Sequence, residues 1–258
     1  MTQYVDNFRK FQPLLYELMA RDVKIKYRRS ALGVLWTLLN PLLMMIILSI
    51  VFSNLFRFDV ENYSLYLLAG QIVFTFFNES TTSAMTSILN NGALIRKVYI
   101  PKYLFVVSRI LSSLINIMAS YCALILVMVF TRSELYYTVF LSIIPLFLLF
   151  VFSLGVGLIL AALAVKFRDV VHLYSVFITA LMYLTPVIYP MSALPDWVQK
   201  IVSLNPLTGI LNMFRGVTIY NTLPDIKDLF ISFCVVFIFL GIGLYIFYKQ
   251  QDEFILNL

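Results

Sequence analysis

Few residues in this chain could do chemistry, and the single histidine is the first to consider. His172 stands three positions after Asp169, but no nucleophile triad or ligand cluster can be assembled around this pair. Cys122 and Cys234 each lie within a long apolar run, so neither joins a C-x-x-C metal pair. We therefore expect His172 to be structural and no metal to be bound.

The sequence also lacks a motif for binding the phosphates of a nucleotide. The P-loop pattern G-x-x-x-x-G-K-[ST] does not occur, and none of the nine glycines is followed by lysine. The carboxylate pairs Asp225/Asp228 and Asp59/Glu61 border apolar segments as ordinary end charges do, whereas a glycan-modifying enzyme would need a pair facing outward. The sequence therefore predicts a protein that is not an enzyme and has no cofactor of its own.

Glu79 is the one carboxylate inside an apolar stretch, and Arg109 matches it in depth. Glu79 lies about nine residues before the end of one predicted helix, and Arg109 lies eight residues beyond Pro101 in the next, antiparallel one. Ionisable groups at such depth are costly and pair with one another, so we expect an ion pair, with contact to a substrate as the alternative. A proton-coupled carrier would need several such carboxylates.

The composition places these residues in a membrane. Of 258 residues, 61% are hydrophobic and only 12% are charged, whereas a soluble domain has about 45–50% and about 25%. Six weakly charged stretches are candidate spans, the second of which reaches full length only if it continues past Glu79 toward residue 95. They are residues 30–56, 62–78, 110–131, 135–165, 170–195 and 229–248.

The distribution of basic residues predicts the orientation. With the amino terminus inside, fourteen of the 19 Lys and Arg residues fall in cytoplasmic segments, so both termini are expected in the cytoplasm. Charges divided in this way disfavour nucleic acid as a partner. We expect one all-α domain over residues 1–258: an amphipathic interface helix over 1–29, six spans within 30–250, and two short outer helices within 190–222 that re-enter the membrane.

Two segments beside the spans carry their own patterns. Residues 190–222 are too apolar for an aqueous loop, and the step Asn205-Pro206 predicts two short amphipathic helices there; an interfacial loop without a gating role is the alternative. Residues 91–102 are both basic and apolar, which favours a short helix docked on a cytoplasmic partner over one resting on lipid headgroups. The basic end of residues 1–29 could equally be a topology anchor near anionic lipid.

Residues 21–36, RDVKIKYRRSALGVLW, followed by Asn40-Pro41-Leu42, closely resemble the amino-terminal signature of the ABC-2 type permeases that export polysaccharides such as O-antigen and teichoic acid. Three further blocks agree in the same order: residues 91–101, residues 168–172, and residues 185–207 with Arg215. The resemblance implies a homodimer of six-helix subunits with a channel at their interface. It also implies two copies of a separate cytoplasmic P-loop ATPase, which hold the ATP and Mg²⁺.

The resemblance also assigns sites. The residues expected to contact the ATPase are Asn91, Gly92, Leu94, Ile95, Arg96, Lys97, Val98, Tyr99 and Pro101. The residues expected at the cytoplasmic entrance are Arg28, Arg29, Leu32 and Gly33. The residues expected in the outer gate are Pro195, Trp197, Asn205, Pro206, Leu207, Ile210 and Leu211.

Aromatic side chains supply a physical reason for a glycan as cargo. Sugar rings present apolar C–H faces that stack on aromatic rings without requiring a particular hydroxyl pattern, so an aromatic path lets a long glycan slide. The candidates are Phe52, Phe56, Tyr174, Phe177, Tyr183 and Tyr189, with packing or interfacial positions as the alternative. The expected function is thus the inner-membrane permease of an ATP-driven exporter of lipid-linked polysaccharide. A drug or lipid exporter of this architecture and an ion-coupled flippase are the alternatives.

Overall fold

The computed structural model describes residues 2–27, 30, 32–55, 60 and 62–257, which form helices and turns without a β-strand among them. The longer helices are α1 (Thr2–Tyr27), α2 (Trp36–Leu55), α3 (Tyr63–Met85), α6 (Tyr103–Phe130), α7 (Ile143–Lys166), α8 (Val170–Tyr183), α9 (Asp196–Ser203), α10 (Pro206–Thr218) and α11 (Ile226–Gln250). Short helical turns are η1 (Gly33–Leu35), α4 (Ser87–Asn90), α5 (Gly92–Ile95), η2 (Tyr137–Ser142), η3 (Met191–Ala193), η4 (Gln251–Glu253) and α12 (Phe254–Asn257). The expectation of an all-α fold is confirmed for these residues.

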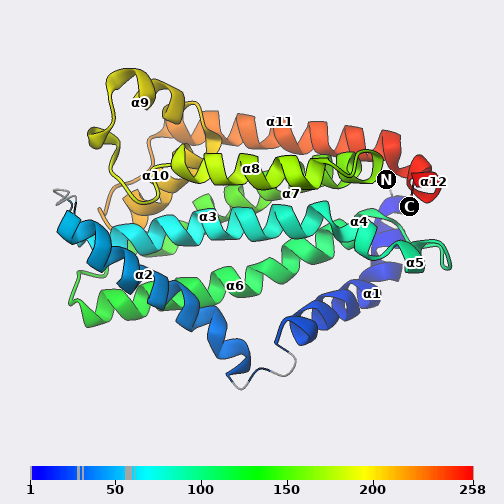
Figure 1. The fold of residues 1–258 in the computed structure, drawn as a ribbon, viewed down its shortest axis with the longest axis horizontal. Coiled ribbons are helices and arrows are strands. Elements are labelled where there is room, and N and C mark those ends of the chain that lie inside the picture. Colours follow the sequence, from blue (N-terminus) through cyan, green and yellow to red (C-terminus); the bar gives the residue numbers. More distant parts are fainter. Residues whose placement is uncertain (1, 28–29, 31, 56–59, 61, 258) are drawn as a thin grey trace.

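The long helices run roughly side by side, so the molecule has two distinct ends (Figure 1). One end carries α1, α5, α12 and both chain termini, and we call it the α1 end. The opposite end carries α9 and the beginning of α11, and we call it the α9 end. The turn that the sequence assigns to a cytoplasmic partner and the helices that it assigns to an outer gate therefore lie at opposite ends.

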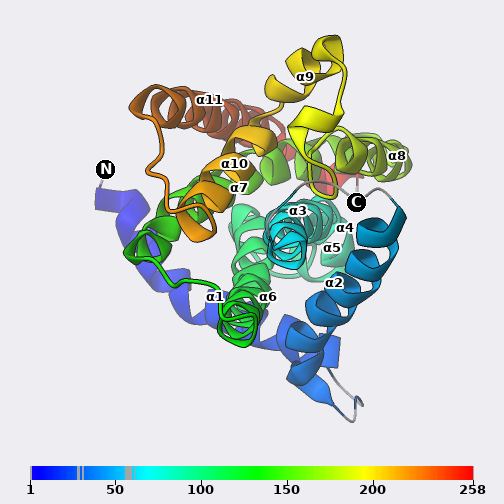
Figure 2. The ribbon, with the colours of Figure 1, turned by 90° about the vertical axis from the view of Figure 1, so that its left-hand side faces the viewer.

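Helix α3 is the centre of the bundle, with α2, α6, α7, α8 and α10 around it (Figure 2). Its residues Leu67, Leu68 and Ala69 have no exposed surface. Its buried Thr81 donates to the carbonyl of Phe77 at 2.6 Å, so the helix itself satisfies this hydroxyl. Such back-bonding lets a central helix hold polar side chains inside an apolar body.

Close backbone contact joins α7 to α11. A Cβ atom added at Gly243 would lie 2.4 Å from the carbonyl oxygen of Gly155, and one added at Gly155 would lie 2.7 Å from the backbone nitrogen of Leu240. Small residues at a helix interface allow backbones to approach in this way, which is the usual packing mode where lipid replaces water. The two glycines therefore set the distance between these helices.

Among the described residues, three segments are long and apolar enough to cross a bilayer: Tyr103–Phe130, Tyr137–Lys166 and Ile226–Glu253. Two further apolar helices are shorter, Trp36–Phe52 and Val170–Tyr183. The stretch predicted over residues 170–195 is wrong at its far end, because α8 stops at Tyr183, just before the Thr185-Pro186 step that disfavours helix. The stretch predicted over residues 110–131 begins earlier, so Arg109 lies within α6.

The segment within residues 190–222 contains the two helices that the sequence predicts. Helix α9 ends at Ser203, and α10 begins at Pro206 with Asn205 as its N-cap, whose side-chain oxygen accepts the backbone N–H of Leu207 at 3.1 Å. An N-cap asparagine before a proline at the first helical position is a strong helix start. That these helices form a gate stays a prediction.

The contact between α7 and α11 predicts a difference between two glycines of the same helix. Gly243→Ala places a methyl group against the backbone of α7 and should destabilise the protein by about 1 to 3 kcal/mol. Gly241→Ala has no atom within 4 Å of the added carbon and should leave stability unchanged or raise it slightly. Thermal unfolding in detergent measures both, and equal unfolding temperatures would contradict the packing described here.

Candidate functional site

A buried arginine holds the chain together where α8 ends. Arg215 of α10 is only 3% exposed, and its guanidinium donates to the carbonyls of Pro186 at 2.7 Å, Val187 at 2.9 Å and Tyr66 at 3.0 Å. The guanidinium carbon also lies 3.4 Å from the centre of the Tyr66 ring. One side chain of α10 therefore supplies donors to the irregular segment after α8 and to the central helix α3.

Two tyrosines of α3 bind the same irregular segment. The Tyr63 hydroxyl donates to the carbonyl of Ile188 at 2.6 Å, and the Tyr66 hydroxyl donates to that of Tyr189 at 2.9 Å. From the other side, the Asn205 amide donates to Thr185 Oγ1 at 2.9 Å. We call residues 184–190, with the side chains that bind them, the carbonyl knot.

A glycine makes room for the arginine. A Cβ atom at Gly70 on α3 would lie 2.6 Å from Arg215 Nη2 and 2.8 Å from the carbonyl oxygen of Val187. Any side chain there would displace either the guanidinium or the backbone it binds. The small residue on α3 and the long one on α10 are thus complementary.

From the sequence, Arg215 is placed with the block of residues 185–207, and no role is predicted for it. The signal that could have identified it is its place in α10, where the neighbouring positions Phe214 and Val217 have no exposed surface. A cation in so apolar a helix is costly unless its donors are satisfied. What the sequence could not indicate is that the acceptors are main-chain carbonyls.

The three α10 residues predicted for the outer gate lie inside the bundle. Leu207, Ile210 and Leu211 are at most 1% exposed and belong to the hydrophobic core. They point into the bundle because α10 packs on α3 and α7. In α9, by contrast, Trp197 is 68% exposed. Pro195 is the N-cap residue of that helix.

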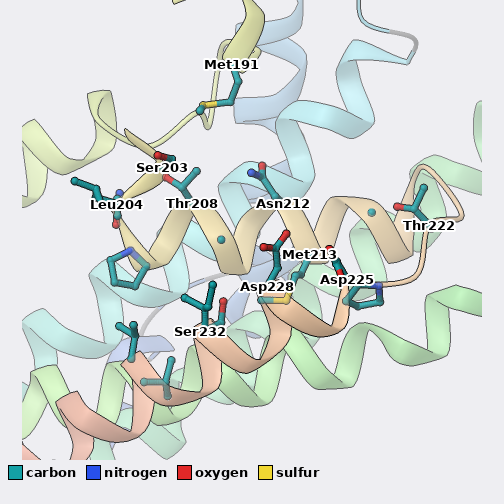
Figure 3. A pocket seen from close by; sticks show the side chains of 18 of the residues that line it. Met191, Ser203, Leu204, Thr208, Asn212, Met213, Thr222, Asp225, Asp228 and Ser232 are labelled. Carbon is teal, nitrogen blue, oxygen red and sulfur yellow. The ribbon is translucent and has the colours of Figure 1, made fainter. Parts of the chain in front are cut away.

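A hollow of about 420 Å³ separates α10 from the start of α11 (Figure 3). Thr208, Asn212, Asp225 and Asp228 are among the polar residues around it. The side chain of Asp225 caps α11 by accepting the backbone N–H of Lys227 at 3.3 Å. On this side α10 meets a polar hollow, so its attachment to the body comes from its apolar face and from the carbonyl knot.

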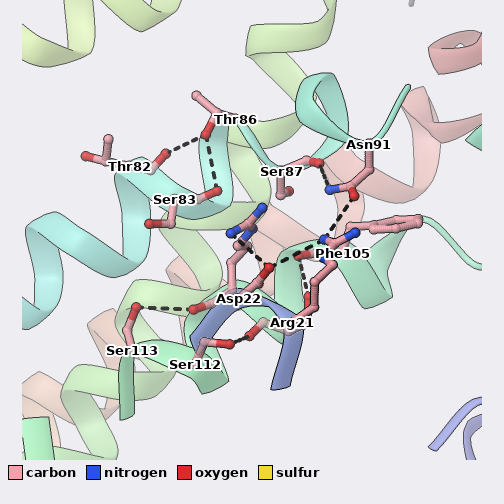
Figure 4. Close-up of polar contacts among 12 residues, drawn as sticks. Arg21, Asp22, Thr82, Ser83, Thr86, Ser87, Asn91, Phe105, Ser112 and Ser113 are labelled. Carbon is pink, nitrogen blue, oxygen red and sulfur yellow. Dashed lines mark hydrogen bonds and ion pairs between the residues drawn. The ribbon is translucent and has the colours of Figure 1, made fainter. Parts of the chain in front are cut away.

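At the α1 end, a second polar network links three helices (Figure 4). Arg109 of α6 pairs with Asp22 of α1, with Nη1 and Oδ1 3.1 Å apart. The neighbouring Arg21 donates to Asn91 Oδ1 at 3.1 Å, and the Asn91 amide donates to the carbonyl of Ser87 at 2.7 Å. The turn between α4 and α5 is thus connected through α1 to α6.

This network corrects the partner predicted for Arg109. Its ion pair in the structure is with Asp22, whereas the carboxylate of Glu79 accepts a hydrogen bond from Asn116 of α6 at 2.6 Å. Glu79 and Arg109 do lie at a similar depth, as the sequence predicts, since both line one hollow beneath α1. The prediction failed because α1 brings a second carboxylate, from a distant part of the sequence, directly against the arginine.

The residues expected to contact an ATPase fall into two groups. Asn91, Gly92 and Ile95 are buried and attach the turn to the bundle, so they are not available to a partner as predicted. Leu94 and Pro101 are partly buried. The exposed members are Arg96, Lys97, Val98 and Tyr99, the last of which is 91% exposed.

The residues expected at the cytoplasmic entrance are described only in part. Arg28 and Arg29 lie outside the described residues. Leu32 is exposed, and Gly33 has φ of +52°, with its N–H donating to Ser30 Oγ at 3.1 Å. A residue with a side chain rarely adopts this left-handed conformation, so the turn before α2 depends on glycine.

The structure separates the expected channel aromatics. Tyr174 is 6% exposed, and its hydroxyl lies 2.6 Å from Thr81 Oγ1, so the prediction that it lines a path is wrong. It is buried because α8 packs this side against α3. The Tyr189 hydroxyl donates to the carbonyl of Tyr183, the last residue of α8. This hydrogen bond ties the irregular segment back to the end of α8.

Two of the other aromatic residues predicted to line the channel have exposed side chains. Phe177 and Tyr183 of α8 are 56% and 66% exposed. Phe52 near the end of α2 is partly buried, and Phe56 lies outside the described residues. Helix α8 is therefore the element that presents aromatic surface.

The chain is similar to known proteins over most of its length. Residues 13–219 match the sequence profile of the ABC-2 type transporter family. An O-antigen export system permease protein, RfbA, of Myxococcus xanthus is 29% identical over 98% of both chains. The polysialic acid transport protein KpsM of Escherichia coli is 22% identical over 93% of this chain and 94% of its own, and a Klebsiella pneumoniae RfbA is 27% identical over 93% of each.

The carbonyl knot predicts that position 215 requires arginine. Arg215→Ala removes the guanidinium donors from the buried carbonyls of Tyr66, Pro186 and Val187 and should cost about 3 kcal/mol. Arg215→Lys keeps the charge but loses the planar fork, so it should recover only part of the loss. Unfolding temperature is the measurement, and Arg132→Lys on an exposed turn is the control. Wild-type stability of Arg215→Lys would rule out the fork as the cause.

The corrected ion pair predicts coupling between α1 and α6. Asp22→Asn and Arg109→Gln should each destabilise the protein, and the double variant should be less unstable than the sum by about 1 to 3 kcal/mol. The same cycle for Glu79→Gln with Arg109→Gln should give a smaller coupling energy. If the second cycle gives the larger value, Arg109 is paired with Glu79 in solution.

Proposed function

The chain belongs to the ABC-2 type transporter family, and on that premise we propose that it is the permease subunit of an ATP-driven exporter of lipid-linked polysaccharide. The observation that supports this most is the similarity, over at least 93% of this chain, to relatives named for O-antigen export and polysialic acid transport. Those names favour a glycan as cargo over the drug or lipid considered from the sequence.

In this proposal, six segments cross the inner membrane. The six are α2, α3, α6, the segment formed by η2 and α7 together, α8, and α11. Helices α9 and α10 lie at the outer surface. Helix α8 has 14 residues and covers about 21 Å, so the irregular residues 184–190 complete its passage. Irregular backbone at membrane depth is tolerated where protein satisfies it, which the carbonyl knot does.

The α1 end is placed in the cytoplasm. The excess of basic residues on that side supports the orientation, since Lys and Arg are enriched in cytoplasmic segments. Both termini lie at this end in the structure, so one orientation accounts for both (Figure 1). The α9 end then faces outward, where an exposed α9 can cover the exit of a channel.

A second copy of the chain would complete that channel. Helices α2 and α8 both present apolar side chains on the outside of the bundle, and a partner subunit could cover them. These side chains are Leu43, Met44, Ile46, Ile47 and Ile50 on α2, and Leu173, Val176, Phe177 and Tyr183 on α8. In such a homodimer, Phe177 and Tyr183 would offer rings on which sugar faces can slide.

Energy for transport must come from another protein, because the sequence has no P-loop. Two copies of a cytoplasmic P-loop ATPase would hold the ATP and Mg²⁺. Their contact on this chain is the exposed side of the turn after α5, where Val98 and Tyr99 supply apolar surface and Arg96 and Lys97 supply charge. Exposed aromatic and apolar residues of this kind are typical anchors at protein interfaces.

Reconstitution tests the proposal. Vesicles that contain this chain and its P-loop ATPase should move lipid-linked polysaccharide across the membrane only when ATP is present, and the chain alone should hydrolyse no ATP. Val98→Asp with Tyr99→Asp should abolish transport and weaken ATPase binding at least about tenfold, because charges replace apolar anchors.

Leu223→Asp is the matched control, since Leu223 is 71% exposed in the turn before α11 at the α9 end. It should bind the ATPase and transport as wild type does. A complex that forms but moves no polysaccharide would refute the proposed cargo, whereas normal binding by the Val98/Tyr99 variant would refute only the proposed contact.

A further inference from the structure

A cavity of about 460 Å³ lies between α2, α3 and α6. We call it the amide cavity, because four amide side chains stand on its wall together with a carboxylate and three hydroxyls. These residues are Thr37, Asn40, Gln71, Thr75, Asn78, Glu79, Asn116 and Ser120. Ligand sites of proteins commonly have volumes in this range.

The amide cavity continues toward the α1 end. Asn78, Glu79 and Asn116 also line the hollow of about 470 Å³ beneath α1. Hydroxyl side chains border that second hollow as well, namely Thr82, Ser83, Ser112 and Ser113, which are labelled in Figure 4. The two hollows are therefore neighbours that share Asn78, Glu79 and Asn116 as wall residues.

The depth of this polar surface is its unusual feature. Asn116 lies near the middle of α6, one of the helices long and apolar enough to cross a bilayer. Gln71 lies near the middle of α3, and Asn78 and Glu79 lie about two turns farther along it. Polar groups at that depth are costly unless they meet a polar partner, and they mark substrate pathways in membrane proteins.

The wall chemistry selects among possible occupants. Gln71 Oε1 is buried and has no hydrogen-bond partner among the described residues, and the carboxylate of Glu79 is a strong acceptor. No lysine or arginine is among the described residues of this wall, and Arg109, which lines the adjoining hollow, is already paired with Asp22. A lipid chain would satisfy none of the polar groups, whereas sugar hydroxyls both donate and accept.

The remaining wall suits a sugar ring. Trp36 and Phe74 line the cavity beside the amides, and their rings can pack against the apolar C–H face of a pyranose. Asn40 and Thr75 are exposed, which shows that the cavity is open. Met182 of α8 also lines it, so it adjoins the helix that carries Phe177 and Tyr183.

We propose that the amide cavity is a binding site for uncharged sugar residues of the transported polysaccharide, with Gln71, Asn78 and Glu79 as its hydrogen-bonding groups. The inference rests on the proposed function and adds to it. The aromatic surface of α8 would let a glycan slide, whereas this cavity would hold individual sugars through their hydroxyls.

Apolar variants of similar size test the transport role. Gln71→Met with Asn78→Leu removes hydrogen bonding and keeps volume, and it should raise the concentration of lipid-linked polysaccharide at half-maximal transport about tenfold. The probe is lipid-linked polysaccharide purified from the cells that make it, supplied to vesicles containing the complex with its ATPase. Asn212→Leu is the control, because Asn212 is an exposed asparagine at the hollow between α10 and α11. This variant should transport as wild type does.

Cysteine protection tests binding directly, and it decides the matter if the double variant fails to fold. In a chain with Cys122→Ser and Cys234→Ser, Thr75→Cys should react with a water-soluble maleimide, and saturating lipid-linked polysaccharide should slow that reaction at least about fivefold. Asn212→Cys should react at the same rate with and without the glycan. A polyprenyl phosphate without sugar should give no protection at Thr75→Cys.

The outcomes separate the two proposals. If the wild-type complex moves no polysaccharide, the proposed function fails and this inference fails with it. If the wild type transports but Thr75→Cys is not protected, only the sugar site is overturned. Protection by the sugar-free polyprenyl phosphate would assign the cavity to the lipid anchor and would equally overturn the sugar site.

Discussion

The structure depends on satisfying main-chain carbonyls where a helix stops inside the protein. After Leu184, whose N–H still bonds the carbonyl of Ala180, the residues up to Pro190 lie outside a helix, and water is scarce at such a position. The guanidinium of Arg215 meets this need with several donors in one plane, and Tyr63 and Tyr66 add two more. Because α3, α8 and α10 all contribute, the arrangement at the α9 end follows from this one constraint.

Local patterns were sufficient to predict many elements. The Asn205-Pro206 step indicated the boundary between two helices, and the weakly charged stretches indicated most long helices, because capping and burial depend on neighbouring residues. The end of α8 at Tyr183 was not predicted, because the uncharged stretch continues past it, although the Thr185-Pro186 step is a local signal against helix. The partner of Arg109 was missed for a related reason: which carboxylate it meets depends on where α1 packs.

The turn after α4 shows why a motif alone could not define a contact surface. Every residue from Asn91 to Pro101 fits one pattern, yet the structure divides them into a buried half that includes Ile95 and an exposed half that includes Tyr99. The buried half is bound to the body through Asn91 and Arg21. A force applied to the exposed half would therefore reach α1 and α6 together.

The two polar networks differ in how completely they are satisfied, and this difference has a consequence for movement. At the carbonyl knot, every nitrogen of Arg215 has an acceptor, so any rearrangement there must first break strong hydrogen bonds. At the α1 end, Asp22 Oδ2 and Arg21 Nε are buried without a partner among the described residues. Groups with spare hydrogen-bonding capacity can exchange partners at lower cost. Exchange of hydrogen-bond partners should thus cost less at the α1 end than at the carbonyl knot.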